Sequence, residues 1–198
     1  MAINGILGTV SYDDERARGH GHDPVIMSGL VKANQGALPV GLLLSRDSDE
    51  KLIPYGEIEN ESVGTGNGTT KAFSKTLAAA PIEPGSVSIT DGVETFSDDG
   101  FGRLWGSAGG YGYVDYEGAQ VVLTFQAAPA NAAAITADYA RAVEGVLDEA
   151  VDTAKTTSAT YIVHGSVRRD ALKVGAVAQA APSAAMLKKL AKKLIYAM

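Results

Sequence analysis

The chain has 198 residues, of which 45% are hydrophobic and 20% charged, and its formal net charge is −6. That length allows one large domain or two small ones of ordinary globular composition, and the acidic balance argues against nucleic acid as a partner. The chain has no cysteine, which excludes disulfides, thiolate metal ligands and cysteine catalysis.

Residues 1–24 are expected to form a flexible arm, because their mixed charges and glycines offer little apolar surface to offset the entropy of ordering. The arm is either a disordered terminus or a segment that orders on a partner. It lacks the basic start and long apolar core of a secretory leader, so we expect synthesis in the cytoplasm. No run of about 18 apolar residues occurs in the sequence, so no membrane partner is expected.

Short apolar runs after the arm predict β-strands. Residues 24–27 and 29–32 read as short strands, and residues 38–45 read as a buried strand. A charged turn follows at residues 46–51. Residues 52–55 then return to an extended conformation, because the residue before a proline is pushed out of the helical region.

From residue 63 to residue 141 the chain becomes rich in Gly, Ser and Thr, with aromatic residues between them. Val87 and Ile89 alternate with serine and threonine, which is the period of a half-buried strand. Asp91-Gly92 is a hairpin turn signal. Many short strands separated by turn residues predict a β-sandwich or a small barrel.

After this block the apolar pattern of the earlier strands returns. We therefore predict a discontinuous base domain, residues 25–62 and 142–198, that is interrupted by an inserted domain, residues 63–141. An inserted domain leaves and rejoins its host at neighbouring points on the surface. This organisation predicts that Tyr55 and Gly145 lie side by side in one continuous sheet.

Residues 184–195 form the one convincing helical pattern of a mainly β chain. Leu187, Leu190 and Leu194 fall on one face with four lysines opposite, and Ser183 provides a start signal. Docking of the apolar stripe on the protein itself is favoured over a membrane surface. Residues 168–174 are expected to form a turn or a short helix.

Histidine offers the main candidate for metal chemistry. His20 and His22 alternate near Asp23, but a closed metal site needs a third and usually a fourth ligand, so a solvated arm is the favoured interpretation. His164 lies in another segment and is interpreted as a structural residue at a strand end. No nucleophile motif or phosphate loop is present. We therefore predict no catalytic, cofactor-binding or metal-binding residues, and no enzyme activity.

An aromatic series occurs inside the inserted block. Its members are Trp105, Tyr111, Tyr113 and Tyr116. Aromatic rings fill β-sheet cores and also stack on sugars and protein partners. Core packing is the favoured interpretation, and an exposed surface that recognises a host glycan or receptor is the alternative.

The split base domain resembles the lambda-type head decoration proteins of tailed bacteriophages. The segments that carry the resemblance are residues 24–27, 36–44, 51–55, 145–152 and 159–167. Each motif is short and apolar and is therefore only moderately specific, but their occurrence in the same order as in that family makes the resemblance more specific. The resemblance covers about residues 24–60 and 143–198. The long insertion is a departure, since smaller members of that family have only a turn there. The insertion itself resembles a β module of phage structural proteins, which implies a sandwich-like unit on the outer surface.

The resemblance implies a structural virion protein. Such proteins form homotrimers at threefold and quasi-threefold positions on the outer surface of an expanded capsid, where the partner is the major capsid protein. The N-terminal arm would add a strand to the shell, and its candidate anchors are Ile3, Ile6, Leu7, Val10 and Tyr12. Binding only to the mature shell would stabilise that shell by mass action.

Overall fold

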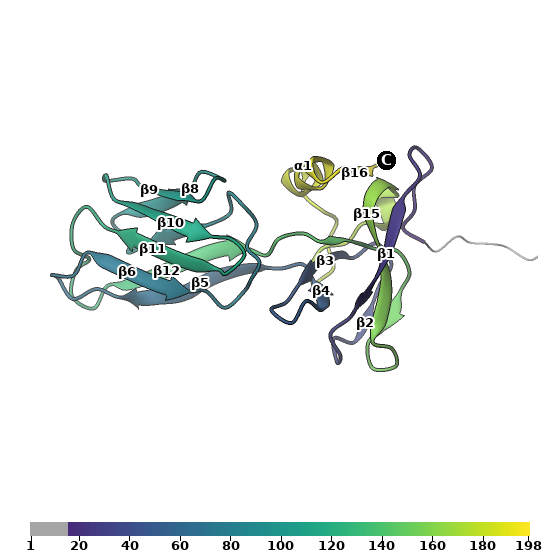
Figure 1. The fold of residues 1–198 in the computed structure, drawn as a ribbon, viewed down its shortest axis with the longest axis horizontal. Coiled ribbons are helices and arrows are strands. Elements are labelled where there is room, and N and C mark those ends of the chain that lie inside the picture. The colour runs from purple at the N-terminus through teal and green to yellow at the C-terminus, as the bar shows by residue number, and fades with distance from the viewer. Residues whose placement is uncertain (1–15) are drawn as a thin grey trace, which may run out of the picture.

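The computed structural model describes residues 16–198. It is mainly β, with 45% of residues in strands and 7% in helices. Two units follow one another along the long axis of the molecule (Figure 1). One holds an eight-stranded sheet that nearly closes into a barrel, and the other holds a six-stranded sheet and one short C-terminal helix.

The six-stranded sheet has the order β1-β15-β13-β3-β4, and β16 pairs with β15 in parallel. Its strands are β1 (Val25–Leu30), β3 (Leu43–Arg46), β4 (Leu52–Pro54), β13 (Gly145–Leu147), β15 (Ser158–Val167) and β16 (Ile195–Ala197). A separate two-stranded sheet joins β2 (Ala37–Leu38) to β14 (Val151–Asp152). We call this whole unit the base.

Strands from both ends of the chain alternate in the base. Gly145 pairs with Leu44, and Leu44 pairs on its other side with Pro54. The backbone N–H of Tyr55 donates to the carbonyl of Leu43 at 2.9 Å. Tyr55 and Gly145 therefore belong to one sheet, with β3 between them rather than in direct contact.

The eight-stranded sheet has the order β5-β12-β7-β8-β9-β10-β11-β6. Its strands are β5 (Glu57–Thr65), β6 (Ala72–Thr76), β7 (Ser88–Thr90), β8 (Thr95–Asp98), β9 (Arg103–Gly106), β10 (Tyr111–Asp115), β11 (Gln120–Thr124) and β12 (Ala134–Ala140). Thr90 pairs with Thr95 across the turn at Asp91-Gly92, which confirms the predicted hairpin. We call this unit the barrel.

The two edge strands of the barrel approach each other. A Cβ placed on Gly64 of β5 would lie 3.1 Å from the Phe73 ring of β6. One sheet that curls back on itself in this way is a barrel, whereas a sandwich has two sheets packed face to face. The sequence pattern left both architectures open and the resemblance implied a sandwich-like unit, whereas the structure has a single, nearly closed barrel-like sheet.

Aromatic rings fill the centre of the barrel. Phe125 meets Phe96 edge to face, with ring centroids 4.9 Å apart, and it meets Phe73 at 5.7 Å. Val87 and Ile89 are buried, as their alternation with serine and threonine predicts. Edge-to-face rings contribute about 0.5–1.5 kcal/mol per pair beyond their buried area.

The helix α1 (Ala184–Lys192) covers one face of the base sheet (Figure 1). Met186 and Leu190 are buried there, in a cluster that includes Leu43 and Val146. The side chain of Ser183 accepts a hydrogen bond from the Met186 N–H, which is the expected N-cap. A second cluster of leucines and Tyr161 packs on the opposite face.

The predicted helix is too long. It ends at Lys192, and Ile195 begins β16, where it pairs with Gly165. Strand β13 pairs only with Tyr161 and Ile162 of β15, and the chain end pairs with Gly165, Ser166 and Val167 further along the same strand. Tertiary hydrogen bonding therefore overrides the helix propensity of these residues. A 3₁₀ helix, η1 (Arg169–Ala171), occupies the segment in which a turn or short helix is expected.

The chain enters the barrel sheet earlier than the predicted boundary between residues 62 and 63. Glu57 already pairs with Ala140, so that boundary falls inside β5. Glu57, Glu59 and Glu61 make this strand resemble a polar linker in sequence. The strand can be this polar because it pairs only with β12 and exposes much of its surface.

Residues 16–24 were expected in the flexible arm, but the structure packs them on the base. Ala17 is fully buried, and its N–H donates to the Asp148 carbonyl at 3.0 Å. Gly19 N donates to the Ser166 carbonyl at 2.8 Å. These hydrogen bonds tie the segment to β15 and its surroundings, which composition alone does not reveal.

Candidate functional site

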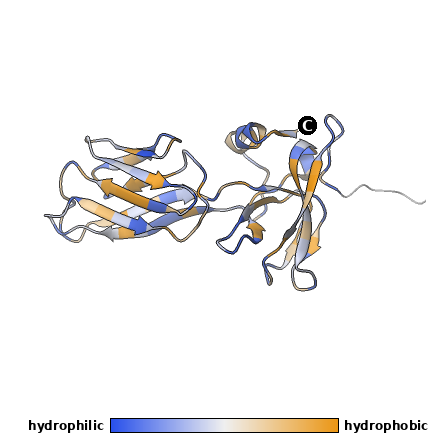
Figure 2. Cartoon of the chain, in the orientation of Figure 1, coloured by the Kyte–Doolittle hydropathy of each residue, from blue (hydrophilic) through white to orange (hydrophobic). Residues whose placement is uncertain are grey.

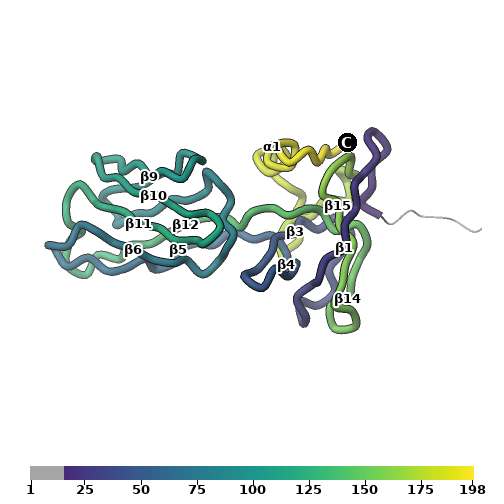
Figure 3. The backbone as a smooth tube through the Cα atoms, in the orientation of Figure 1, coloured from purple at the N-terminus to yellow at the C-terminus, as the bar shows by residue number. Residues whose placement is uncertain are grey.

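The connection between the two units is short and hydrogen-bonded. The chain crosses between them twice, after Tyr55 and before Val143 (Figure 3). The Arg141 N–H donates to the Gly56 carbonyl at 3.3 Å, so the two crossings run together. The Ala140 carbonyl also accepts from the Glu83 N–H at 2.9 Å. The barrel is therefore held on two paired strands rather than on a loose tether.

An ionic network stands on the base side of this junction. Arg46 donates to Glu144 at 2.9 Å and to the Tyr161 hydroxyl at 2.7 Å. The hydrogen bond with Glu144 raises the pKa of Arg46 above its ordinary value. Burial, followed by the nearby Glu144 charge, raises the pKa of Tyr161. Neither shift marks a catalytic group, because the three side chains satisfy one another.

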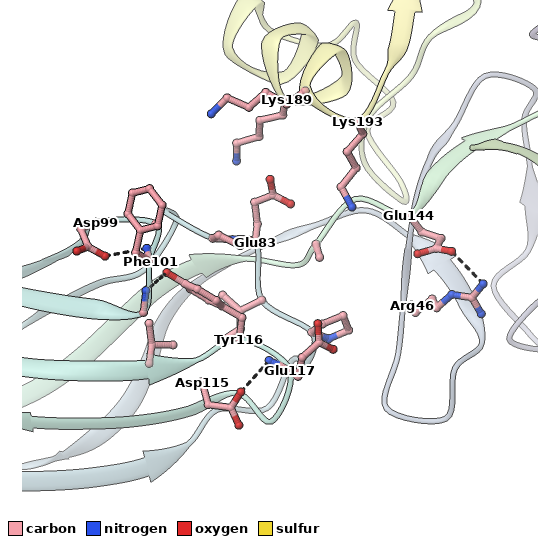
Figure 4. Close-up of a pocket in the computed structure, with 18 of the residues that line it drawn as sticks. Arg46, Glu83, Asp99, Phe101, Asp115, Tyr116, Glu117, Glu144, Lys189 and Lys193 are labelled. Atoms are coloured by element: carbon pink, nitrogen blue, oxygen red, sulfur yellow. Dashed lines mark hydrogen bonds and ion pairs between the residues drawn. The ribbon is translucent and has the colours of Figure 1, made fainter. Parts of the chain in front are cut away.

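A cleft of about 910 Å³ lies between the units (Figure 4). Lys189 of α1 and Lys193, which follows the helix, point into it, facing Glu83, and Phe101 lines the barrel side. Among the described residues, no ion pair within 4.0 Å joins these lysines to the barrel. Charges of both signs line the cleft. The lysine face of α1 is directed towards the barrel.

Arg18, near the start of the described chain, binds Asp148 of the base, and we call this contact the clamp. Arg18 Nη2 lies 2.6 Å from Asp148 Oδ2, and Arg18 Nε donates to both carboxylate oxygens. Asp148 is fully buried, so this bidentate contact holds Arg18 firmly against the base. The predicted anchors Ile3, Ile6, Leu7, Val10 and Tyr12 lie outside the described residues.

Strand β1 lies at the edge of the base sheet and carries apolar side chains on its surface. Val25, Met27 and Leu30 are each about half exposed. Figure 2 shows the apolar character of this strand beside β15. Within residues 16–198, β15 is the strand that pairs with β1, which leaves its other edge open. An open apolar edge can accept a strand from a partner.

Three of the four aromatic residues singled out in the sequence share the outer face of the barrel. Trp105 is 57% exposed, Tyr111 65% and Tyr113 54%. Trp105 pairs directly with Tyr111 across β9 and β10. The favoured interpretation of core packing was therefore wrong for these three side chains, which are exposed, whereas a role in recognition stays a prediction.

Tyr116 behaves differently from the other three. Its hydroxyl donates to Asp98 at 2.6 Å and accepts from the Gly102 N–H at 2.9 Å, while its ring packs against the barrel core. Burial, followed by the bond to Asp98, raises the pKa of Tyr116 to about 12. Its contacts indicate that Tyr116 stabilises the turn before β9.

The structure brings together two histidines from distant segments. The His22 and His164 rings meet edge to face at 4.9 Å, although the sequence places them far apart. His164 lies within β15, where it pairs with Val25, rather than at the strand end. Nevertheless, residues 16–198 contain no group of three or more His, Cys, Asp or Glu side chains arranged to hold a metal.

Two further findings concern function. Within the part of the chain that the structure describes, no helix is long and apolar enough to cross a bilayer. Comparison of the chain with protein-family models, with curated proteins and with solved structures gave no match. Function must therefore be argued from the residues and their arrangement.

Proposed function

We propose that this chain is a structural virion protein that binds the outer surface of a mature tailed-phage capsid and stabilises the shell. In this proposal three copies assemble at threefold and quasi-threefold positions and contact the major capsid protein. The base carries the resemblance to lambda-type head decoration proteins. The barrel is an inserted unit that projects from the virion.

The pairing of β13 with β3 carries the proposal. Residues on both sides of the insertion alternate in one sheet, with Gly145 beside Leu44. The insertion begins and ends at paired residues, Glu57 and Ala140. This arrangement supports a base that is complete without the barrel, as a decoration domain with an added outer unit requires.

The direction of the chain supports the same proposal. The described chain begins at the end of the long axis opposite the barrel (Figure 1). The clamp between Arg18 and Asp148 fixes the start of the segment that leads to residues 1–15. A shell contact at this end would leave the barrel pointing outwards, and the apolar edge of β1 is available to a neighbouring chain.

The test uses shells assembled from the major capsid protein of the same phage, in their unexpanded and expanded forms. The full chain is expected to sediment with expanded shells only, and to raise the temperature at which they melt. A variant lacking residues 1–15 should stay folded but no longer bind. Trp105→Ala, on the outer face of the barrel, is the matched control and should bind normally. Absence of binding to expanded shells would refute the proposal, and normal binding by the deletion variant would refute the role of the arm.

A further inference from the structure

We propose that the outer face of β9 and β10 binds an uncharged saccharide, with Trp105 and Tyr111 stacking on a sugar ring. This proposal goes beyond capsid binding and does not depend on it. The aromatic platform, defined as Trp105, Tyr111 and Tyr113, is the largest group of exposed rings that neighbouring strands bring together within residues 16–198.

Side chains alternate between the two faces of the sheet along β9 and β10, and this alternation places the three rings on the outer face. Leu104 and Val114 of the same strands are buried in the barrel core, so their sequence neighbours Trp105 and Tyr113 face solvent. The Gly106 N–H donates to the Gly110 carbonyl, which makes Trp105 and Tyr111 the adjacent non-hydrogen-bonded pair. At such pairs facing side chains start closest together, so Trp105 and Tyr111 lie beside each other on the same face of the sheet.

The platform is held in place by the turn before β9. Asp99 accepts hydrogen bonds from the backbone N–H groups of Phe101, at 2.8 Å, and of Arg103, at 3.2 Å. The bond from Phe101 is the largest influence lowering the pKa of Asp99. These two bonds fix the backbone of the turn that leads into β9, the strand that carries Trp105.

Polar groups flank the rings on both sides. Ser97 of β8 pairs with Trp105, Thr124 of β11 pairs with Tyr111, and Arg103 pairs with Tyr113. A pyranose has apolar C–H faces and a rim of hydroxyls, so stacked rings with hydroxyl and guanidinium groups beside them match its chemistry. A protein partner would need about 800 Å² of contact surface on this chain, which three rings on two neighbouring strands do not supply by themselves.

The charge of the barrel decides between classes of saccharide. Residues 57–140 carry 11 Asp and Glu against 3 Lys and Arg, a net charge of −8. The remainder of the chain carries 12 acidic against 14 basic residues, a net charge of +2. An anionic polysaccharide would be repelled by this unit, whereas a neutral one would not. We therefore infer that the ligand is uncharged.

Trp105 is the only tryptophan in the chain, so its fluorescence reports directly on the platform. The full-length protein is titrated with maltoheptaose, chitohexaose and soluble yeast mannan as neutral probes, and with hyaluronan and heparin as anionic ones. At least one neutral probe is expected to shift or quench the emission at millimolar concentration. Hyaluronan and heparin should leave the emission unchanged.

Two variants distinguish stacking of a sugar ring on Tyr111 from nonspecific effects of removing an exposed aromatic ring. Tyr111→Ala keeps the reporter and should weaken binding of the responding probe about tenfold. Tyr196→Ala removes an exposed ring from β16 on the base and should bind normally. Thermal melting monitored by circular dichroism verifies that both variants are folded. No response to any neutral probe, a response to the anionic probes alone, or unchanged binding by Tyr111→Ala would overturn the proposal. None of these results bears on capsid binding.

Discussion

Arg46 and Glu144, 98 positions apart in the chain, form an ion pair with 2.9 Å between Nη2 and Oε1. Between them the chain builds the whole barrel and returns. The pair stands beside the two crossings and links β3 to the start of β13. Its position shows that the two ends of the insertion belong to one folded base.

Excision of the barrel tests this relationship. Replacing residues 57–140 by a short Gly-Ser turn should leave the base folded, because Gly56 and Arg141 already meet through a hydrogen bond of 3.3 Å. Nuclear magnetic resonance should show dispersed amide signals, and urea unfolding should be cooperative. Excision of residues 67–130, which leaves β5 and β12 without the rest of their sheet, is the matched control and should give a poorly folded product. A disordered base after excision of residues 57–140 would contradict the interpretation that the base folds without the barrel.

The clamp at the root of the N-terminal segment should contribute measurably to stability. Asp148→Asn removes the charge that a fully buried side chain presents to Arg18, so the free energy of unfolding should fall by about 1–3 kcal/mol. Asp170→Asn removes an exposed pair with Arg168 and should lower the free energy of unfolding much less than Asp148→Asn does. Urea denaturation compares the two variants, and equal losses would show that the clamp is no stronger than a surface pair.

Two glycines with similar backbone angles should respond differently to alanine. Gly41 has φ +79° and Gly36 has φ +76°, so each substitution costs about 1–2 kcal/mol in the left-handed region. A Cβ on Gly41 would also lie 1.9 Å from the Ala171 carbonyl oxygen, whereas nothing lies within 4 Å of one on Gly36. Gly41→Ala should therefore have the lower denaturation midpoint by a clear margin. Equal midpoints would contradict the packing of η1 against this turn.

The barrel should lose stability at alkaline pH. Burial, followed by a hydrogen bond to Glu61, raises the pKa of Tyr139 to about 12. A raised pKa means that the folded state favours the neutral phenol. The contribution of Tyr139 is therefore complete below the unfolded pKa of about 10 and is lost as pH rises towards 12. Tyr139→Phe should flatten this decline in the free energy of unfolding between pH 10 and pH 12. A decline as steep as that of the unsubstituted protein would show that other groups cause it.

Local sequence patterns predicted where strands occur better than they predicted which strands pair with one another. The alternation at Val87 and Ile89 and the turn at Asp91-Gly92 were sufficient for a hairpin, because both signals act within a few residues. Ile195 was assigned to the helix because its contact with Gly165 is tertiary and leaves no local signal. The same reason explains why the pairs between Arg18 and Asp148 and between Arg46 and Glu144 were not foreseen.

The candidate recognition surface was only partly predictable. The sequence identified the four aromatic residues but not which face of the sheet is buried, and that face depends on pairing with β8 and β11. The open edge of β1 was also missed, since an apolar strand at an edge and one in a core have similar composition. The predicted arm anchors stay a prediction.

Electron cryomicroscopy of expanded shells saturated with the full chain tests the proposed function most directly. The account predicts three copies around each threefold and quasi-threefold position, with the base against the major capsid protein and the barrel pointing away from the shell. Shells that bear the barrel against their surface, or that show no ordered density for the chain at these positions, would contradict it.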